Sequence, residues 1–149
     1  MNGSDRASIR SACPTNRQIG RELDSITLKA LLAVPLTAVS SQVPYRFCSD
    51  RACPTVYYRT DGQQVFGETD LRERVYQKHP DEPATVVCYC FDITVGEIRD
   101  VVERSAQSAL VARITGGIRA GQCACDIRNP QGTCCLNNVR TLLEPVAKC

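Results

Sequence analysis

The chain has 149 residues, with 18 basic and 16 acidic side chains and a net charge of +2. This length fits one ordinary domain or two small ones. The balanced charge provides no concentrated positive surface, so we expect neither nucleic acid nor an anionic membrane as a partner. Aromatic residues make up only 5% of the chain and Trp is absent, so small lobes with little core would gain from bound metal.

Residues 1–12 are polar and lack periodicity, which predicts a disordered lead-in. Residues 24–39 are apolar and rich in β-branched side chains, which predicts one or two strands broken at Pro35. This apolar segment is shorter than the roughly 20 residues of a membrane-spanning helix. We therefore expect no membrane insertion.

A cysteine-containing loop from Cys48 to Cys53 follows the aromatic residues Tyr45 and Phe47. A strand is predicted to leave this loop at 55–58, turn at residues 60–63 and resume at Val65, because Asp-Gly is a favoured hairpin dipeptide. Residues 13–80 are thus expected to form a small antiparallel β lobe with cysteines in its loops.

Residues 70–83 are charged and end in prolines, which indicates a connector and a domain boundary near residue 80. Thr94 and Glu97 have the spacing of a capping box, and the apolar residues that follow predict a helix over 95–106. The remaining pattern predicts a shorter helix at 108–113 that stops before Gly116-Gly117, a loop over 121–133 with a turn at 129–132, and a final helix from Cys134 to about Glu144. The expected fold class is α+β, with a helical domain over 84–149.

Ten cysteines are the unusual feature of the composition. Disulfide frameworks are typical of exported proteins, whereas metal and redox sites are typical of reducing compartments. The first residues are polar and lack the apolar segment of an export signal. We therefore predict a cytoplasmic protein whose thiols are reduced or bound to metal.

Cysteines of the second half lie beside the expected helix starts. Cys88 and Cys90 precede the first helix, Cys134-Cys135 opens the last, and Cys123 and Cys125 lie in the loop between them. A 2Fe–2S cluster takes four thiolates and carries negative charge, which amide N–H groups and helix N-termini offset. We expect the glycines at 116, 117 and 121 to let the loop approach the cluster closely. Zinc is the alternative, because a tetrahedral four-thiolate site suits either metal.

This spacing resembles the bacterioferritin-associated ferredoxin type of 2Fe–2S domain. It resembles more closely the amino-terminal domain of CopZ-type copper chaperones, which carries a 2Fe–2S cluster and a separate zinc ion. The similarity is carried by the segments 87–90, 114–116 and 125–135, of which the last, ending Asn-Pro-Gln-Gly-Thr-Cys-Cys, is the most specific. The resemblance implies these cluster ligands, with Cys123 and Cys134 as alternates: Cys88, Cys90, Cys125 and Cys135.

The first half is similar to the zinc site of the same family through Cys48-x4-Cys53 and the Val-Tyr-Tyr that follows. The resemblance implies zinc on Cys13, Cys48 and Cys53. The family opening Cys-Pro-x-Cys ends here at Asn16, so the fourth zinc ligand stays open. His79 lies in the charged connector, and we expect it to be a solvated surface residue. Cys149 is expected to be a flexible terminal thiol.

The sequence contains no evident nucleophile–base pair, phosphate-binding loop or paired catalytic carboxylates, which argues against a hydrolase or transferase. The resemblance implies a metal-handling protein in copper or related heavy-metal homeostasis. Its cluster would exchange single electrons, with Cu(II) reduction to Cu(I) as the one candidate reaction, and a metal transporter would be a fitting partner. The family's second-domain copper motif, Met-x-Cys-x-x-Cys, does not occur here. The alternatives are therefore a ferredoxin-like electron carrier or redox or iron sensor without copper, and a purely structural zinc protein.

Overall fold

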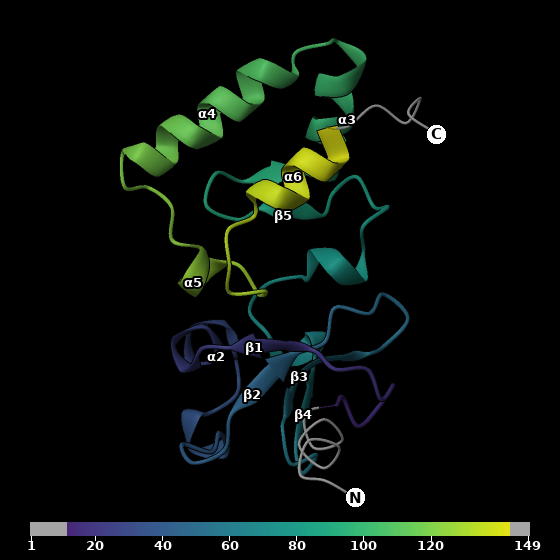
Figure 1. Cartoon of the computed structure of the whole chain (residues 1–149), viewed down its shortest axis with the longest axis vertical. Coiled ribbons are helices and arrows are strands. Elements are labelled where there is room, and N and C mark those ends of the chain that lie inside the picture. The colour runs from purple at the N-terminus through teal and green to yellow at the C-terminus, as the bar shows by residue number, and fades with distance from the viewer. Residues whose placement is uncertain (1–11, 144–149) are drawn as a thin grey trace, which may run out of the picture.

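The structure is a computed structural model that describes residues 12–143. Figure 1 shows two lobes along the long axis of the molecule, a sheet lobe from the first half and a helical lobe from the second. The elements of the sheet lobe are β1 (Arg21–Leu23), α2 (Ser25–Leu31), η1 (Leu36–Ala38), β2 (Tyr45–Phe47), β3 (Thr55–Arg59), β4 (Val65–Gly67), η2 (Glu68–Asp70) and η3 (Tyr76–Lys78). Those of the helical lobe are β5 (Val86–Cys88), β6 (Ile93–Thr94), α3 (Val95–Glu103), α4 (Gln107–Arg119), α5 (Cys125–Arg128) and α6 (Leu136–Leu143).

The sheet lobe contains one four-stranded antiparallel sheet in the order β1-β2-β3-β4. The predicted hairpin is confirmed, because β3 and β4 pair and Gly62 adopts a positive φ of 77° in the turn between them. Central strand β3 is buried along most of its length. Tyr57 joins the hydrophobic core, whereas Tyr58 groups with the buried cysteines.

Residues 25–31 form helix α2, so the prediction of strands over 24–39 was wrong. Leu28, Leu31 and Leu32 recur at helical spacing, and all three are buried in the core of the sheet lobe. Ile26, one of the β-branched residues that favoured a strand, is exposed. The spacing of the buried leucines therefore decides the conformation of this segment.

Helix α3 confirms the predicted helix after Thr94. The Glu97 amide donates to the Thr94 side-chain oxygen at 3.1 Å, which caps the helix N-terminus. The Glu97 carboxylate pairs with Arg113 of α4. The helix ends at Glu103 rather than at residue 106, because Ser105 adopts a positive φ of 54°.

Helix α4 runs through Gly116 and Gly117, so the prediction that it stops before them was wrong. A Cβ at Gly117 would lie 2.3 Å from the Phe91 ring, whereas one at Gly116 would meet nothing within 4 Å. Gly117 thus permits close packing and does not break the helix. The helix ends where Gly121 takes a positive φ of 75°. Gly116 and Gly117 therefore do not belong to a loop around the cysteines.

Two further features of the helical lobe were not predicted. β5 and β6 form a short antiparallel hairpin before α3. Helix α5 interrupts the segment 121–133 that was expected to be loop throughout. The final helix α6 begins at Leu136, after the cysteine pair. The predicted turn at 129–132 is confirmed by a bond from the Gly132 amide to the Asn129 carbonyl oxygen at 2.8 Å.

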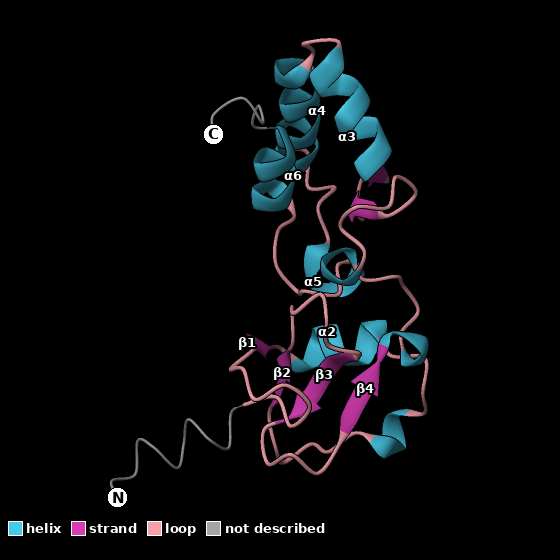
Figure 2. Cartoon of the chain, turned by 90° about the vertical axis from the view of Figure 1, so that its right-hand side faces the viewer, coloured by secondary structure: helices cyan, strands magenta, loops and turns pink. Residues whose placement is uncertain are grey.

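Each lobe has its own hydrophobic core. Figure 2 shows α5 lying between the sheet lobe and the other helices, and α5 packs against α2. A Cβ at Gly132, in the loop after α5, would approach the Thr27 side chain to 3.0 Å. The division of the chain near residue 80 remains a prediction. Among residues 12–143, none of the helices combines the length and apolar character needed to cross a membrane.

The predicted lead-in lies outside the described residues, apart from Ala12, which pairs with Ile19 in an antiparallel bridge. Cys149 and Glu144 also lie outside them. The mixed α+β class is confirmed by the described residues.

Candidate metal centres

The first candidate site joins two loops of the sheet lobe. Cys13 lies in a turn closed by the Ala12–Ile19 bridge, and Cys48 and Cys53 lie in the loop between β2 and β3. We call Cys13, Cys48 and Cys53 the N-terminal thiol site. All three side chains are buried, and their sulfur atoms lie within 4.8 Å of one another.

The sulfur spacing of this site fits a single metal ion. Two thiolates on one tetrahedral zinc lie about 3.8 Å apart, given Zn–S bonds of about 2.3 Å. The Sγ atoms of Cys13 and Cys53 are 3.9 Å apart. The donor set is soft and suits zinc. The residues therefore fit the predicted zinc ion, which they would hold through three thiolates.

The surrounding groups shift the pKa values of these thiols in opposite directions. Burial raises the pKa of Cys48 to about 11. Burial also opposes ionisation of Cys13, yet the backbone N–H groups of Asn16 and Thr15 outweigh it and lower the pKa of this thiol. The Lys78 ammonium donates to the carbonyl oxygens of Asp50 and Cys53, at 2.7 and 2.8 Å, and thereby fixes the loop. A bound cation would hold all three sulfurs as thiolates.

Asn16 occupies the fourth side of the N-terminal thiol site. Its side-chain nitrogen donates to Cys48 Sγ at 3.4 Å and to Asp50 Oδ2 at 2.9 Å. Among residues 12–143, the group of close donors contains no further cysteine, histidine or carboxylate.

His79 is held by carboxylates. Its Nε2 atom lies 2.6 Å from Glu68 Oε1 and its Nδ1 atom 2.9 Å from Glu82 Oε2. The side chain is 28% exposed, so the expectation of a freely solvated histidine is corrected to a partly buried, carboxylate-bound one. Both ring nitrogens therefore have carboxylate partners.

The second candidate site gathers cysteines from three segments of the helical lobe. Cys88 ends β5 and Cys90 lies in the turn after it, Cys123 and Cys125 lie at the start of α5, and Cys135 precedes α6. We call these five residues the C-terminal thiol site. The structure turns Cys135 inward, with 1% of its surface exposed, and Cys134 outward.

Short contacts connect the five sulfurs. Cys125 Sγ lies 3.6 Å from both Cys90 Sγ and Cys123 Sγ. Cys135 forms hydrogen bonds with the thiols of both Cys88 and Cys125. Cys125 is therefore central, with Cys90 and Cys123 on one side and the more deeply buried pair Cys88 and Cys135 on the other.

Hydrogen bonding shifts the ionisation of these thiols. The bond with Cys135 lowers the pKa of Cys125 to about 5 and also lowers that of Cys88, while it raises the pKa of Cys135 itself. Burial raises the pKa of Cys90 to about 12. The thiols of Cys135 and Cys90 therefore hold their protons more firmly than those of Cys125 and Cys88 do, and a bound metal centre would displace these protons.

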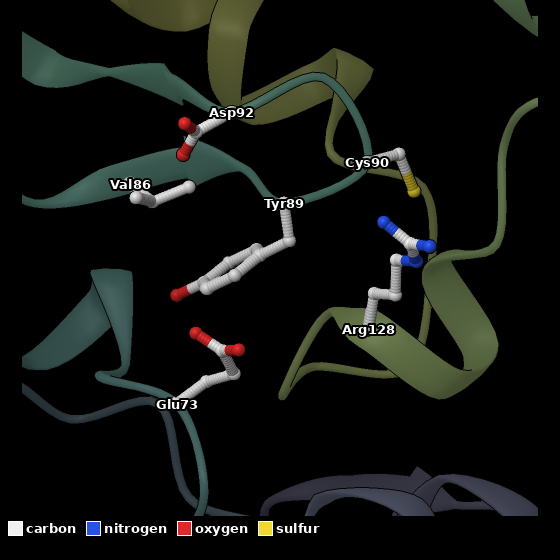
Figure 3. Close-up of a pocket in the computed structure, with 6 residues that line it drawn as sticks. All are labelled: Glu73, Val86, Tyr89, Cys90, Asp92 and Arg128. Atoms are coloured by element: carbon white, nitrogen blue, oxygen red, sulfur yellow. The ribbon is translucent and has the colours of Figure 1, made fainter.

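Two groups beside Cys90 favour negative charge at the site, and neither was identified from the sequence. The Ala124 amide donates to Cys90 Sγ at 3.0 Å. Figure 3 shows the Arg128 side chain, from α5, pointing toward the Cys90 sulfur across a surface pocket. Arg128 lies one helical turn after Cys125, and that spacing is the only sequence signal that could have identified it.

The C-terminal thiol site fits a 2Fe–2S cluster by the chemistry of its donors. Such a cluster needs four thiolates, two per iron, and five thiols converge here. Sulfurs 3.6 Å apart match two ligands on one tetrahedral metal. Cys88, Cys90, Cys125 and Cys135 would supply the four ligands, which leaves Cys123 in excess. No disulfide joins any cysteine of residues 12–143.

Comparisons with known proteins identify a zinc-binding domain and one similar solved structure. Residues 10–72 match a family model described as a zinc binding domain. The chain is similar to the X-ray structure of the Archaeoglobus fulgidus CopZ N-terminal domain, with 30% sequence identity and a TM-score of 0.71. The alignment covers 91% of this chain and 99% of that one. A comparison with curated proteins gives no match. Because the identity and coverage extend over both lobes, the chain belongs to the family of the CopZ N-terminal domain.

Proposed function

We propose that this chain is a metal-handling protein with two inorganic centres. Zn²⁺ is held by Cys13, Cys48 and Cys53, and a 2Fe–2S cluster by the ligands Cys88, Cys90, Cys125 and Cys135. The protein serves copper or related heavy-metal homeostasis in a reducing, cytoplasmic environment. It works with metal ions and with a protein partner that accepts the metal or the electron.

The convergence of five thiols in the helical lobe supports the cluster. The segments that supply them are separated by up to 47 positions, from Cys88 to Cys135, yet the sulfurs form one connected group. Thiols are costly to bury together as thiolates unless a cation compensates their charge. A hydrophobic core has no need for thiols grouped in this way, whereas a 2Fe–2S cluster needs four of them.

The choice of four ligands from five follows burial and contact. Cys88 and Cys135 are fully buried and joined by a thiol hydrogen bond, so they form one pair. Cys90 and Cys125, with sulfurs 3.6 Å apart, form the other. Cys123 contacts Cys125 from the more exposed side. This arrangement supports two ligands for each iron, with Cys123 outside the cluster.

A 2Fe–2S centre supplies one-electron exchange. The Ala124 amide and Arg128 beside Cys90 would stabilise the more negative, reduced state. In the copper role, one electron from the reduced centre would convert Cu(II) to Cu(I), which thiolates prefer. The second candidate, an electron carrier or redox or iron sensor, would use the same one-electron exchange without copper.

The first test is metal analysis of anaerobically purified protein together with its visible spectrum. We expect iron and acid-labile sulfide in equal amounts, two of each per chain, with one zinc. The protein should be brown and should bleach with dithionite. A colourless protein with two zinc ions and no iron would contradict the cluster and favour a purely structural zinc protein.

A second test separates the two candidate roles. We would add Cu(II) to the dithionite-reduced, desalted protein under anaerobic conditions and follow Cu(I) with a chromogenic chelator. One Cu(I) formed per oxidised cluster, and retained by the protein before chelator is added, supports the copper role. Cluster oxidation without copper retention supports the electron-carrier role.

A further inference from the structure

We propose a second use of the C-terminal thiol site: when the cluster is absent, Cys90, Cys123 and Cys125 bind a single thiophilic metal ion. We call these three residues the exchange triad. The proposal shares Cys90 and Cys125 with the cluster site and in that respect rests on the proposed function. It assigns a role to Cys123, the thiol that the four-ligand cluster does not use.

The geometry of the exchange triad supports this assignment. The three sulfurs lie within 4.8 Å of one another, the same limit that the N-terminal thiol site meets. Both distances to Cys125 Sγ are 3.6 Å, close to the roughly 3.8 Å expected for two thiolates on one ion. Within residues 12–143, the exchange triad and the N-terminal thiol site are the two groups of three or more candidate ligands that meet this limit.

Exposure distinguishes the triad from the rest of the site. Cys90 and Cys123 are partly exposed, whereas Cys88 and Cys135 are 0% and 1% exposed. An ion arriving from solvent therefore meets the triad first. A pocket lined in part by Cys90, Tyr89 and Arg128 opens on this side (Figure 3).

The surroundings suit three thiolates on one ion. Three thiolates with Zn²⁺ carry one net negative charge, and the Ala124 amide and Arg128 beside Cys90 offset it. Three protein ligands leave one position for water, as in open zinc sites. Binding replaces each remaining thiol S–H bond with an S–metal bond and releases the proton to solvent, with no change in oxidation state.

Sharing of ligands makes the two forms mutually exclusive. Cys90 and Cys125 cannot ligate a separate ion and a cluster iron at once. The single-ion form therefore precedes cluster assembly or follows cluster loss, and the protein would keep a bound metal in both states.

The experiment counts zinc in cluster-free, full-length chain. Iron is removed with a chelator under anaerobic, reducing conditions, Zn²⁺ is added as the probe, and tightly bound zinc is measured after desalting. We expect two ions in the natural protein, two in Cys88→Ser and one in Cys123→Ser. Cys134→Ser removes the adjacent exposed thiol and serves as the matched control, which should keep both ions.

A four-thiolate zinc site at the cluster ligands would give the opposite pattern. Cys88→Ser would then lose the second ion and Cys123→Ser would keep it, and either result overturns the proposal. One ion in the natural protein also overturns it. The ion in the N-terminal thiol site and the far-ultraviolet circular dichroism report whether each variant folds, and Cys123→Ala replaces the serine variant if it does not.

Cluster reconstitution on the same variants separates this proposal from the proposed function. Cys123→Ser should still accept a cluster, and Cys88→Ser should not. Failure of the natural protein to form any cluster would refute the proposed function, yet the zinc counts would still decide the triad.

Discussion

The Tyr57 hydroxyl donates a buried hydrogen bond of 2.6 Å to the carbonyl oxygen of Pro130, 73 positions later in the chain. Tyr57 lies on the central strand β3, and Pro130 lies in the loop between α5 and α6. The strand begins two residues after Cys53, and the loop lies between Cys125 and Cys135. This bond therefore ties the loop of one thiol site to the sheet that carries the other.

Tyr57→Phe should lower the free energy of unfolding by about 1–2 kcal/mol, because the Pro130 oxygen loses its buried donor. The effect should be concentrated in the loop after α5. Hydrogen exchange at the Gln131 and Gly132 amides, which bond to Asn129, would measure it. Tyr58→Phe is the control, since the Tyr58 hydroxyl accepts from Gly20 within the sheet lobe. Equal exchange in both variants would contradict a link between the lobes.

Cys125→Ser should abolish the cluster, whereas Cys123→Ser should retain it. Cys125 contacts Cys90, Cys123 and Cys135, so its loss removes the centre of the thiol group. The visible spectrum and the iron content of anaerobically purified variants measure the effect. The reverse result would show that Cys123 is the cluster ligand and that Cys125 is the spare thiol.

Asn16→Cys should tighten zinc binding at the N-terminal thiol site. The Asn16 side chain already lies 3.4 Å from Cys48 Sγ, and a cysteine at this position would complete a Cys-x2-Cys pair with Cys13, as in zinc knuckles. Competition with a chelator of known zinc affinity measures the change. Asn16→Ala removes the amide without adding a thiol and should bind no tighter than the natural chain. An equal affinity in Asn16→Cys and Asn16→Ala would show that a fourth ligand already comes from elsewhere.

Gly117→Ala should destabilise the helical lobe by about 1–3 kcal/mol, since its methyl group would collide with the Phe91 ring. Phe91 follows Cys90, so the displacement should also weaken cluster retention. Gly116→Ala is the matched control one position earlier. Its methyl group meets nothing within 4 Å, and it should stabilise the helix by about 0.5–1 kcal/mol. Chemical denaturation of both variants measures these changes, and equal stability would mean that Phe91 moves aside freely.

Signals confined to a few neighbouring residues were sufficient to predict part of the fold. The Asp61-Gly62 turn set the β3–β4 hairpin because glycine alone accepts its positive φ cheaply. Thr94 set the start of α3 because its oxygen satisfies the Glu97 amide. Neither feature depends on distant parts of the chain, and each can be recognised from adjacent residues.

The errors occurred where packing overrides local preference. The β-branched residues near Ile26 favoured a strand, but burial of Leu28 and Leu31 against the sheet stabilises a helix. The Gly116-Gly117 pair predicts a helix end, but Gly117 lies within α4 and leaves space for the Phe91 ring from a distant turn. Such contacts depend on the tertiary arrangement, and the pattern of neighbouring residues does not reveal them.

In the candidate sites, too, some features follow from the local sequence and others from tertiary packing. Residue spacing was enough to nominate the cysteines, because thiolates are the common ligands of zinc and iron–sulfur centres. It could not show that Cys123 is as close to Cys125 as Cys90 is, since that depends on how the turn before α5 folds. It also could not place Asn16 against Cys48, a contact between two separate loops. The assignment of individual ligands remains a prediction.

Cys135, in the loop before α6, is the last cysteine of the two thiol sites to be synthesised, so the two sites are completed at different times. During synthesis, Cys13, Cys48 and Cys53 are all added to the chain before Cys88. The N-terminal thiol site can therefore take its ion while the rest of the chain is still being translated. The C-terminal thiol site is complete only once Cys135 has been added and the three segments that carry its cysteines have come together. The proposed zinc ion and the proposed cluster would thus reach the nascent chain at different moments, and a shortage of one would affect the protein at a different stage from a shortage of the other.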